Sequence, residues 1–184
     1  FFLFISGRFL MNDQEKWDKA KAFHGHECPG LAIGFATVKA LTEHIPTGTS
    51  ADEQIVCITE NDTCACDAIQ SLLSCTFGKG NLIYRPTGKM AFNFYFRDSG
   101  KKLRLYFKAE NTENLDREAW RKKIFSAPGT ELFDFSEPPI ELPEQARIFN
   151  SVACDLCGEK AREDKIRLQE GKKVCLSCFN SYDR

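Results

Sequence analysis

The nine cysteines of this 184-residue chain constrain it more than any other feature, because they fall into two groups with different chemistry. Four lie near the C-terminus in two C-x-x-C pairs separated by seventeen residues, namely Cys154, Cys157, Cys175 and Cys178. Zinc favours about four tetrahedral ligands, and a C-x-x-C turn directs two thiolates at one ion. We therefore predict a zinc finger at residues 148–184, of the treble-clef or zinc-ribbon kind, that Zn²⁺ itself helps to fold.

Cysteine usage also bears on the compartment. Nine is an odd number, and paired C-x-x-C units suit thiolate–metal chemistry better than a disulfide framework. We expect the reducing cytoplasm. The net charge is only −1, and the basic residues of the finger interleave with acidic ones, so nucleic acid is not an expected partner. No membrane partner is expected either, because the apolar first ten residues are too short to span a bilayer.

Three boundaries divide the chain. Residues 1–11 are predicted as an N-terminal extension, because a charged segment resembling an ordinary N-terminus starts directly after Met11. Residues 12–127 are predicted as a core. Residues 128–147 are predicted as a linker to the finger, because they contain four of the seven prolines, namely Pro128, Pro138, Pro139 and Pro143.

Within the core, the apolar residues alternate between helical and strand spacing. The spacing predicts helices at 13–23, 30–44, 67–74 and 115–125, and strands at 54–60 and 82–84. Residues 91–97 and 102–108 alternate strongly and flank a turn at Asp98-Ser-Gly-Lys, which predicts a hairpin. The fold class is therefore α+β, with a mostly antiparallel sheet covered by helices.

The second cysteine group includes a compact set of metal-binding side chains. His24, His26 and Cys28 alternate with other residues, so in an extended segment they face the same side. Pro29 suits the first turn of a helix, and the helix dipole favours a thiolate at the residue before it. Imidazole and thiolate together bind zinc, copper or iron. The sequence thus predicts a second metal in the core, Zn²⁺ or another transition metal.

Two further segments could complete this site. Cys64 follows the strand at 54–60, and Cys75 precedes a glycine-rich turn that contains Lys79. That turn lacks the spacing of a Walker loop, but its glycines would let backbone amides approach a small anion beside the lysine charge. Cys57 lies inside the predicted strand and is expected to be a small buried hydrophobic residue, and Cys66 is expected to be structural as well.

Read together, these segments resemble the FmdE family of formylmethanofuran dehydrogenase proteins over about residues 12–110. The matching residues are His24-Gly25-His26-Glu27-Cys28-Pro29-Gly30, then Glu60-Asn61-Asp62-Thr63-Cys64 with Asp67 and Gln70, and finally Cys75-Thr76-Phe77-Gly78-Lys79-Gly80-Asn81. Members often add a C-terminal cysteine finger. The resemblance implies an α+β core, a homodimer, a larger oxidoreductase complex as partner, and a metal-binding cleft lined by histidine and cysteine.

The resemblance also implies roles for individual residues. The implied metal ligands of the core are His24, His26, Cys28, Cys64 and Cys75. Asp67, Gln70, Thr76 and Lys79 are implied contacts of these ligands or of a substrate. If the protein is catalytic, as a component associated with a metal-dependent oxidoreductase, the candidates are Cys28, Cys64, Cys75 and Lys79.

Three functions follow from these observations. The first, which we favour, is a metal-binding accessory protein whose core metal is redox-active or binds a small anion or a thiol-reactive ligand. The second is a metal-sensing regulator whose finger docks on protein or nucleic acid. The third is a structural zinc scaffold, in which four ligands would close the core site.

Overall fold

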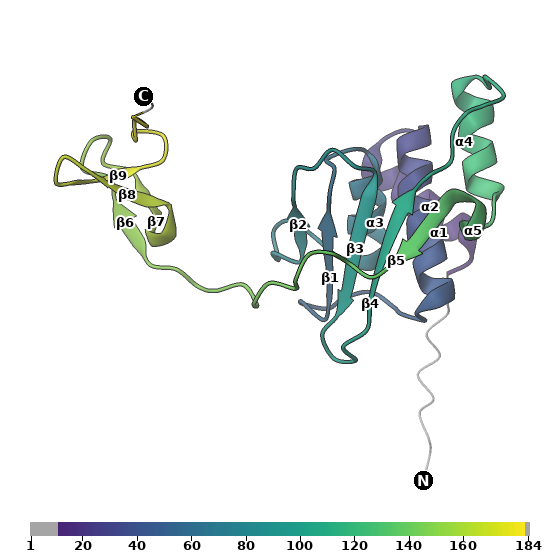
Figure 1. Cartoon of the computed structure of the whole chain (residues 1–184), viewed down its shortest axis with the longest axis horizontal. Coiled ribbons are helices and arrows are strands. Elements are labelled where there is room, and N and C mark those ends of the chain that lie inside the picture. Colours follow the sequence, from purple (N-terminus) through teal and green to yellow (C-terminus); the bar gives the residue numbers. More distant parts are fainter. Residues whose placement is uncertain (1–10, 183–184) are drawn as a thin grey trace, which may run out of the picture. The chain divides into compact units, whose positions relative to one another are not determined.

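The structure is a computed structural model that describes residues 11–182, and the chain divides into two compact units between Glu144 and Gln145 (Figure 1). The predicted N-terminal extension, except for Met11, lies outside the described residues. Among the helices of the described part, none is long and apolar enough to cross a membrane.

The first unit begins with two helices joined by a short turn. α1 (Asp13–His24) starts at a capping box formed by Asn12 and Glu15, and it ends at Gly25, whose φ of 90° is left-handed. α2 (Pro29–His44) begins directly after Cys28. Ten of its 16 residues are buried, so α2 is the central helix of the unit.

A five-stranded sheet lies against the helices (Figure 1). Its strands are β1 (Ile55–Thr59), β2 (Leu82–Tyr84), β3 (Ala91–Phe96), β4 (Lys102–Phe107) and β5 (Phe133–Ser136), in the order β2-β1-β3-β4-β5. β1 and β2 are parallel and are connected through α3 (Ala65–Leu73), whereas the other pairs are antiparallel. α4 (Arg117–Ser126) and α5 (Gly129–Leu132) complete the unit. The predicted α+β class, with a helix-covered and mostly antiparallel sheet, is confirmed.

The segment predicted as a linker begins differently from our expectation. Residues 129–136 form α5 and β5, and β5 pairs with β4 so that Phe133 lies opposite Phe107. Phe133 is 1% exposed and belongs to the main hydrophobic core. The alternation of Phe133 and Phe135 is a strand signal that the neighbouring prolines conceal. The linker prediction is therefore wrong for residues 129–136.

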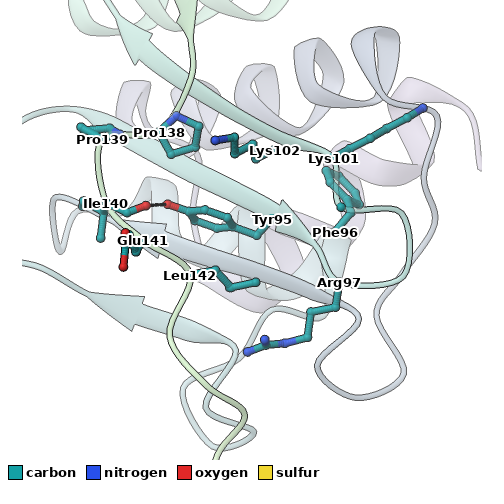
Figure 2. A pocket seen from close by; sticks show the side chains of 11 residues that line it. Tyr95, Phe96, Arg97, Lys101, Lys102, Pro138, Pro139, Ile140, Glu141 and Leu142 are labelled. Carbon is teal, nitrogen blue, oxygen red and sulfur yellow. Dashed lines mark hydrogen bonds between the residues drawn. The ribbon is translucent and has the colours of Figure 1, made fainter.

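After β5, residues 138–143 pack against the sheet near β3 (Figure 2). The Tyr95 hydroxyl donates to the carbonyl of Ile140, and the Arg97 guanidinium donates to the carbonyl of Pro143 over 3.0 Å. Val56, Ile58 and Tyr95 form a second buried cluster, with Ile83, Ile140 and Leu142 packed against it. These contacts enclose a pocket of about 410 Å³.

A buried carboxylate ties together the strand ends that precede the Cys64 segment. Glu60 is 3% exposed and accepts hydrogen bonds from Arg104 over 2.9 Å, Asn93 over 3.1 Å and Thr87 over 2.7 Å. Burial alone would raise the pKa of Glu60, but these donors outweigh it and lower the pKa below its ordinary value. The ionised carboxylate therefore links β3 and β4 to the loop that starts at Asn61.

The second unit consists of two small antiparallel hairpins. β6 (Ser151–Ala153) pairs with β7 (Lys160–Arg162), and β8 (Ile166–Gln169) pairs with β9 (Lys172–Cys175) after a short 3-10 helix, η1 (Glu163–Lys165). Its buried hydrophobic cluster contains only Cys154, Val174 and Cys175 within the described residues. So small a core leaves the cysteine cluster as the main source of stability.

Candidate metal centres

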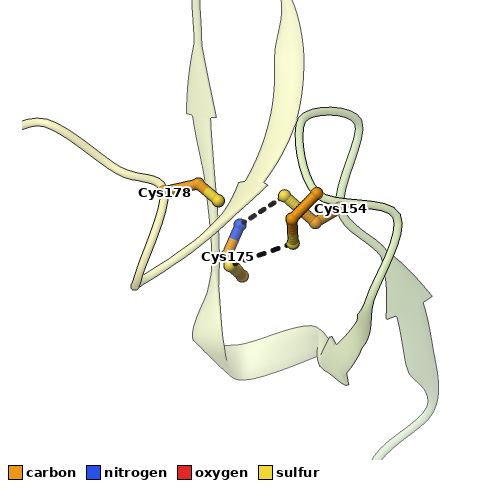
Figure 3. Close-up of side chains that lie close together, drawn as sticks. Cys154, Cys175 and Cys178 are labelled. Atoms are coloured by element: carbon orange, nitrogen blue, oxygen red, sulfur yellow. Dashed lines mark hydrogen bonds between the residues drawn. The ribbon is translucent and has the colours of Figure 1, made fainter.

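The four C-terminal cysteines converge as the spacing predicts. Their sulfurs all lie within 4.8 Å of one another (Figure 3). The backbone amide of Cys175 donates to the sulfur of Cys154 over 3.3 Å. Hydrogen bonds from the amides of Cys157, Cys175 and Leu156 lower the pKa of Cys154 to about 6, which favours the thiolate that zinc requires.

A second cluster lies in the turn between α1 and α2. The ligand atoms of His24, His26 and Cys28 lie within 4.8 Å of one another. His24 is the last residue of α1, and Cys28 caps the N-terminus of α2, so two helices fix the ends of the turn. The Nε2 atom of His24 lies 3.6 Å from the Cys28 sulfur, and the sulfur also accepts a hydrogen bond of 3.2 Å from the amide of Leu31.

A carboxylate from α3 orients the first histidine. The Nδ1 atom of His24 lies 2.7 Å from a carboxylate oxygen of Asp67, and Gln70 donates to the other oxygen over 3.3 Å. This contact leaves Nε2 free to face Cys28. A carboxylate behind a histidine that binds a metal through its other nitrogen is a common arrangement, which raises the basicity of the ligand. The donor set therefore fits a transition metal in both its ligands and its supporting contacts.

Cys64 lies at the edge of this cluster. It directly precedes α3, and a Cβ atom placed on Gly30 would lie 3.6 Å from the Cys64 sulfur and 3.8 Å from the Cys28 sulfur. Both thiols thus flank the bare backbone of Gly30. Burial and the contact with Cys28 raise the pKa of Cys64.

The structure does not bring Cys75 or Lys79 to the cluster. Cys75 is fully buried and donates to the carbonyl of Ile55 over 3.5 Å, and burial raises its pKa to about 12. The Lys79 ammonium donates to the carbonyl of Ser50 over 2.9 Å. Thr76 hydrogen bonds through its amide to the side chain of Asn81, so this segment closes its own turn. Cys57 is fully buried, as expected.

A pocket of about 450 Å³ adjoins the cluster. It is lined by His24 and Cys64 together with Asp62, Asp67, Gln70, Phe77 and Tyr84 among others, and none of the described residues that line it is lysine or arginine. Phe77 is 79% exposed and Tyr84 is 41% exposed, so two aromatic rings are open to solvent at this site. Sequence reasoning missed Tyr84, because nothing in the short strand that it ends sets it apart.

Comparisons with known proteins agree with this geometry. A family described as "FmdE, Molybdenum formylmethanofuran dehydrogenase operon" matches residues 23–134, and a prokaryotic dksA/traR C4-type zinc finger matches residues 147–184. A crystal structure of an FmdE-like protein of tungsten formylmethanofuran dehydrogenase from Syntrophus aciditrophicus is similar, with a TM-score of 0.67 and 27% identity, and the match covers 91% of this chain and 92% of that one.

A curated relative extends the comparison. A protein of Archaeoglobus fulgidus named "Probable S-adenosyl-L-methionine-binding protein" is 31% identical over 195 residues, which cover 89% of this chain. The chain spans only 52% of that relative's length. The family match covers more than half of the chain and contains the clustered His24, His26 and Cys28, and the finger match contains the second cluster. The chain therefore belongs to the FmdE family and carries a C4-type zinc finger at its C-terminus.

Proposed function

We propose that this protein is a metal-binding accessory protein of the FmdE type, in which His24, His26 and Cys28 hold a transition metal in the core. The observation that carries the proposal is the convergence of their ligand atoms within 4.8 Å, with Asp67 behind His24. Bound there, the metal would supply a Lewis acid or a redox centre. The finger would hold a separate, structural Zn²⁺.

The surrounding residues have distinct tasks in this proposal. Asp67 fixes the ring of His24, and the amide of Leu31 stabilises the Cys28 thiolate. Two imidazoles and one thiolate leave room for a fourth donor, which is either the Cys64 sulfur or a small or thiol-reactive ligand from the adjoining pocket. Lys79 takes no part, because its ammonium is held at Ser50.

Metal content tests the core site. We expect two metal ions per chain by plasma mass spectrometry of protein purified without a metal-affinity column, and one in a Cys28→Ser/His26→Ala variant. Cys66→Ser is the matched control and should keep both ions, because its thiol is engaged with the carbonyl of Asn61 over 3.4 Å. Circular dichroism should show that both variants fold. One ion per chain in all three proteins would refute the core site.

We infer S-adenosylmethionine binding as a second candidate function, because the pocket lining suits it. The ligand carries a sulfonium cation and a purine ring. Carboxylates such as Asp62 attract the cation, and the exposed rings of Phe77 and Tyr84 offer surfaces on which the purine or the cation can lie. The name of the Archaeoglobus fulgidus relative supports the same ligand.

A pair of ligands that differ in charge tests this function. By isothermal titration calorimetry, we expect S-adenosylmethionine to bind about tenfold more tightly than S-adenosylhomocysteine, which lacks the methyl group and the positive charge. Asp62→Asn should remove most of that preference. Asp98→Asn, in the exposed turn between β3 and β4, is the matched control and should leave it unchanged. Equal affinity for the two ligands in the unmodified protein, or no binding, would refute this candidate.

A further inference from the structure

We propose that Cys28 and Cys64 are a peroxide-sensitive dithiol, and that their oxidation to a disulfide releases the core metal. The part that concerns metal release rests on the proposed function, whereas the disulfide itself does not. Both cysteines are free and immediately precede helices, α2 for Cys28 and α3 for Cys64. Their sulfurs flank Gly30, at 3.8 Å and 3.6 Å from the position of its missing Cβ atom.

The two thiols have complementary environments. Cys28 lies beside the His24 imidazole at 3.6 Å and receives the amide hydrogen bond of Leu31, and both contacts favour the nucleophilic thiolate. Cys64 is only half-buried and lines the pocket of about 450 Å³. Cys28 is buried but lines a second cavity of about 340 Å³. A small oxidant can therefore approach the pair from either cavity.

The remaining cysteines are less suited to this reaction. Cys57 and Cys75 interact with each other, but both are 0% exposed and line neither of these two cavities. Cys66 directs its thiol at the carbonyl of Asn61 over 3.4 Å and lies 3.5 Å from the Thr59 hydroxyl. The four finger cysteines form their own cluster. Accessibility and proximity thus combine only at Cys28 and Cys64 among the five core cysteines.

The reaction balances with hydrogen peroxide as the oxidant. The Cys28 thiolate attacks one peroxide oxygen, so that a sulfur–oxygen bond forms, the oxygen–oxygen bond breaks, and the departing hydroxide takes up the thiol proton as water. The Cys64 sulfur then attacks the Cys28 sulfenic acid. A sulfur–sulfur bond forms, the sulfur–oxygen bond breaks, and a second water leaves with the Cys64 proton. Two thiols are oxidised, and one peroxide is reduced to two waters.

Peptide mapping tests the proposal on the full-length chain. After treatment with one equivalent of hydrogen peroxide, alkylation and digestion without reductant, we expect a peptide in which Cys28 and Cys64 are cross-linked. Dithiothreitol should reverse the cross-link. Cys66→Ser is the matched control and should give the same product. Cys64→Ser should instead stop at a Cys28 sulfenic acid that dimedone traps. Absence of the Cys28–Cys64 peptide, or a cross-link between Cys64 and Cys66, would overturn the proposal.

Metal analysis of the same samples separates the two claims. Loss of about one metal ion per chain on oxidation, with recovery after reduction and resupply of Zn²⁺, is the expected result. A disulfide without metal release, in protein that never held a core metal, would leave the dithiol standing and refute the proposed function. A loaded core site that survives peroxide with no disulfide would do the reverse. A disulfide that leaves a loaded site occupied would refute the coupling of oxidation to release.

Discussion

A Gly34→Ala substitution is expected to lower the free energy of unfolding of the core by about 3 kcal/mol. A Cβ atom at this position would lie 2.2 Å from the carbonyl oxygen of Ala65 and 2.7 Å from its Cα atom. These are backbone atoms, which cannot rotate away as a side chain can. Alanine in a helix is otherwise more favourable than glycine by about 1 kcal/mol, so the sign of the effect is diagnostic. Urea unfolding followed by circular dichroism measures it.

The matched control is Gly78→Ala. No heavy atom lies within 4 Å of the Cβ position of Gly78, so the expected change is within about 0.5 kcal/mol. Gly34→Ala should also weaken the core metal site, because the clash displaces Ala65 and with it the adjoining Cys64. If Gly34→Ala were as stable as the unmodified protein, α2 and α3 could not pack as closely as described.

Removal of zinc is expected to unfold the finger and leave the core folded. Chelation, or a Cys154→Ser substitution, should abolish the protection of residues 150–182 from hydrogen exchange, while peptides from α2 keep theirs. The reason is the size of the finger core, in which only Cys154, Val174 and Cys175 are buried among the described residues. Structural zinc contributes about 10–16 kcal/mol in finger peptides, which far exceeds what so few side chains supply.

Hydrogen exchange followed by mass spectrometry measures this effect. Leu168→Ala is the control, because Leu168 is 74% exposed in the same finger and its truncation should preserve both zinc and protection. Persistent protection of β8 and β9 in zinc-free protein would show that the hairpins fold on their own.

The sequence predicted the parts of both sites that are local in the chain. The C-x-x-C pairs and the alternation of His24, His26 and Cys28 contain their own geometry, because a turn or a helix end brings neighbouring residues together. Helices and strands of the core were predicted within two residues of their observed bounds, since their apolar spacing is regular.

The remaining errors concern tertiary placement. Cys75 belongs to a recognisable motif, but it is buried against Ile55 of β1, a contact between residues twenty positions apart that no spacing rule reveals. Lys79 is similarly held by Ser50. β5 was missed because its two phenylalanines lie among prolines, and only pairing with β4 makes the strand. Asp67 was placed correctly by resemblance, although its contact with His24 depends on the docking of α3.

The position of the core ligands along the chain gives metal capture an order in time. His24, His26 and Cys28 lie within five consecutive residues, so a nascent chain presents all three as soon as the turn between α1 and α2 has been synthesised. Cys64 and Asp67 join them only after α3 has packed against α2. An ion held weakly by the turn would become tightly bound when that packing is complete, and its binding energy would then favour the docked helices over the open chain.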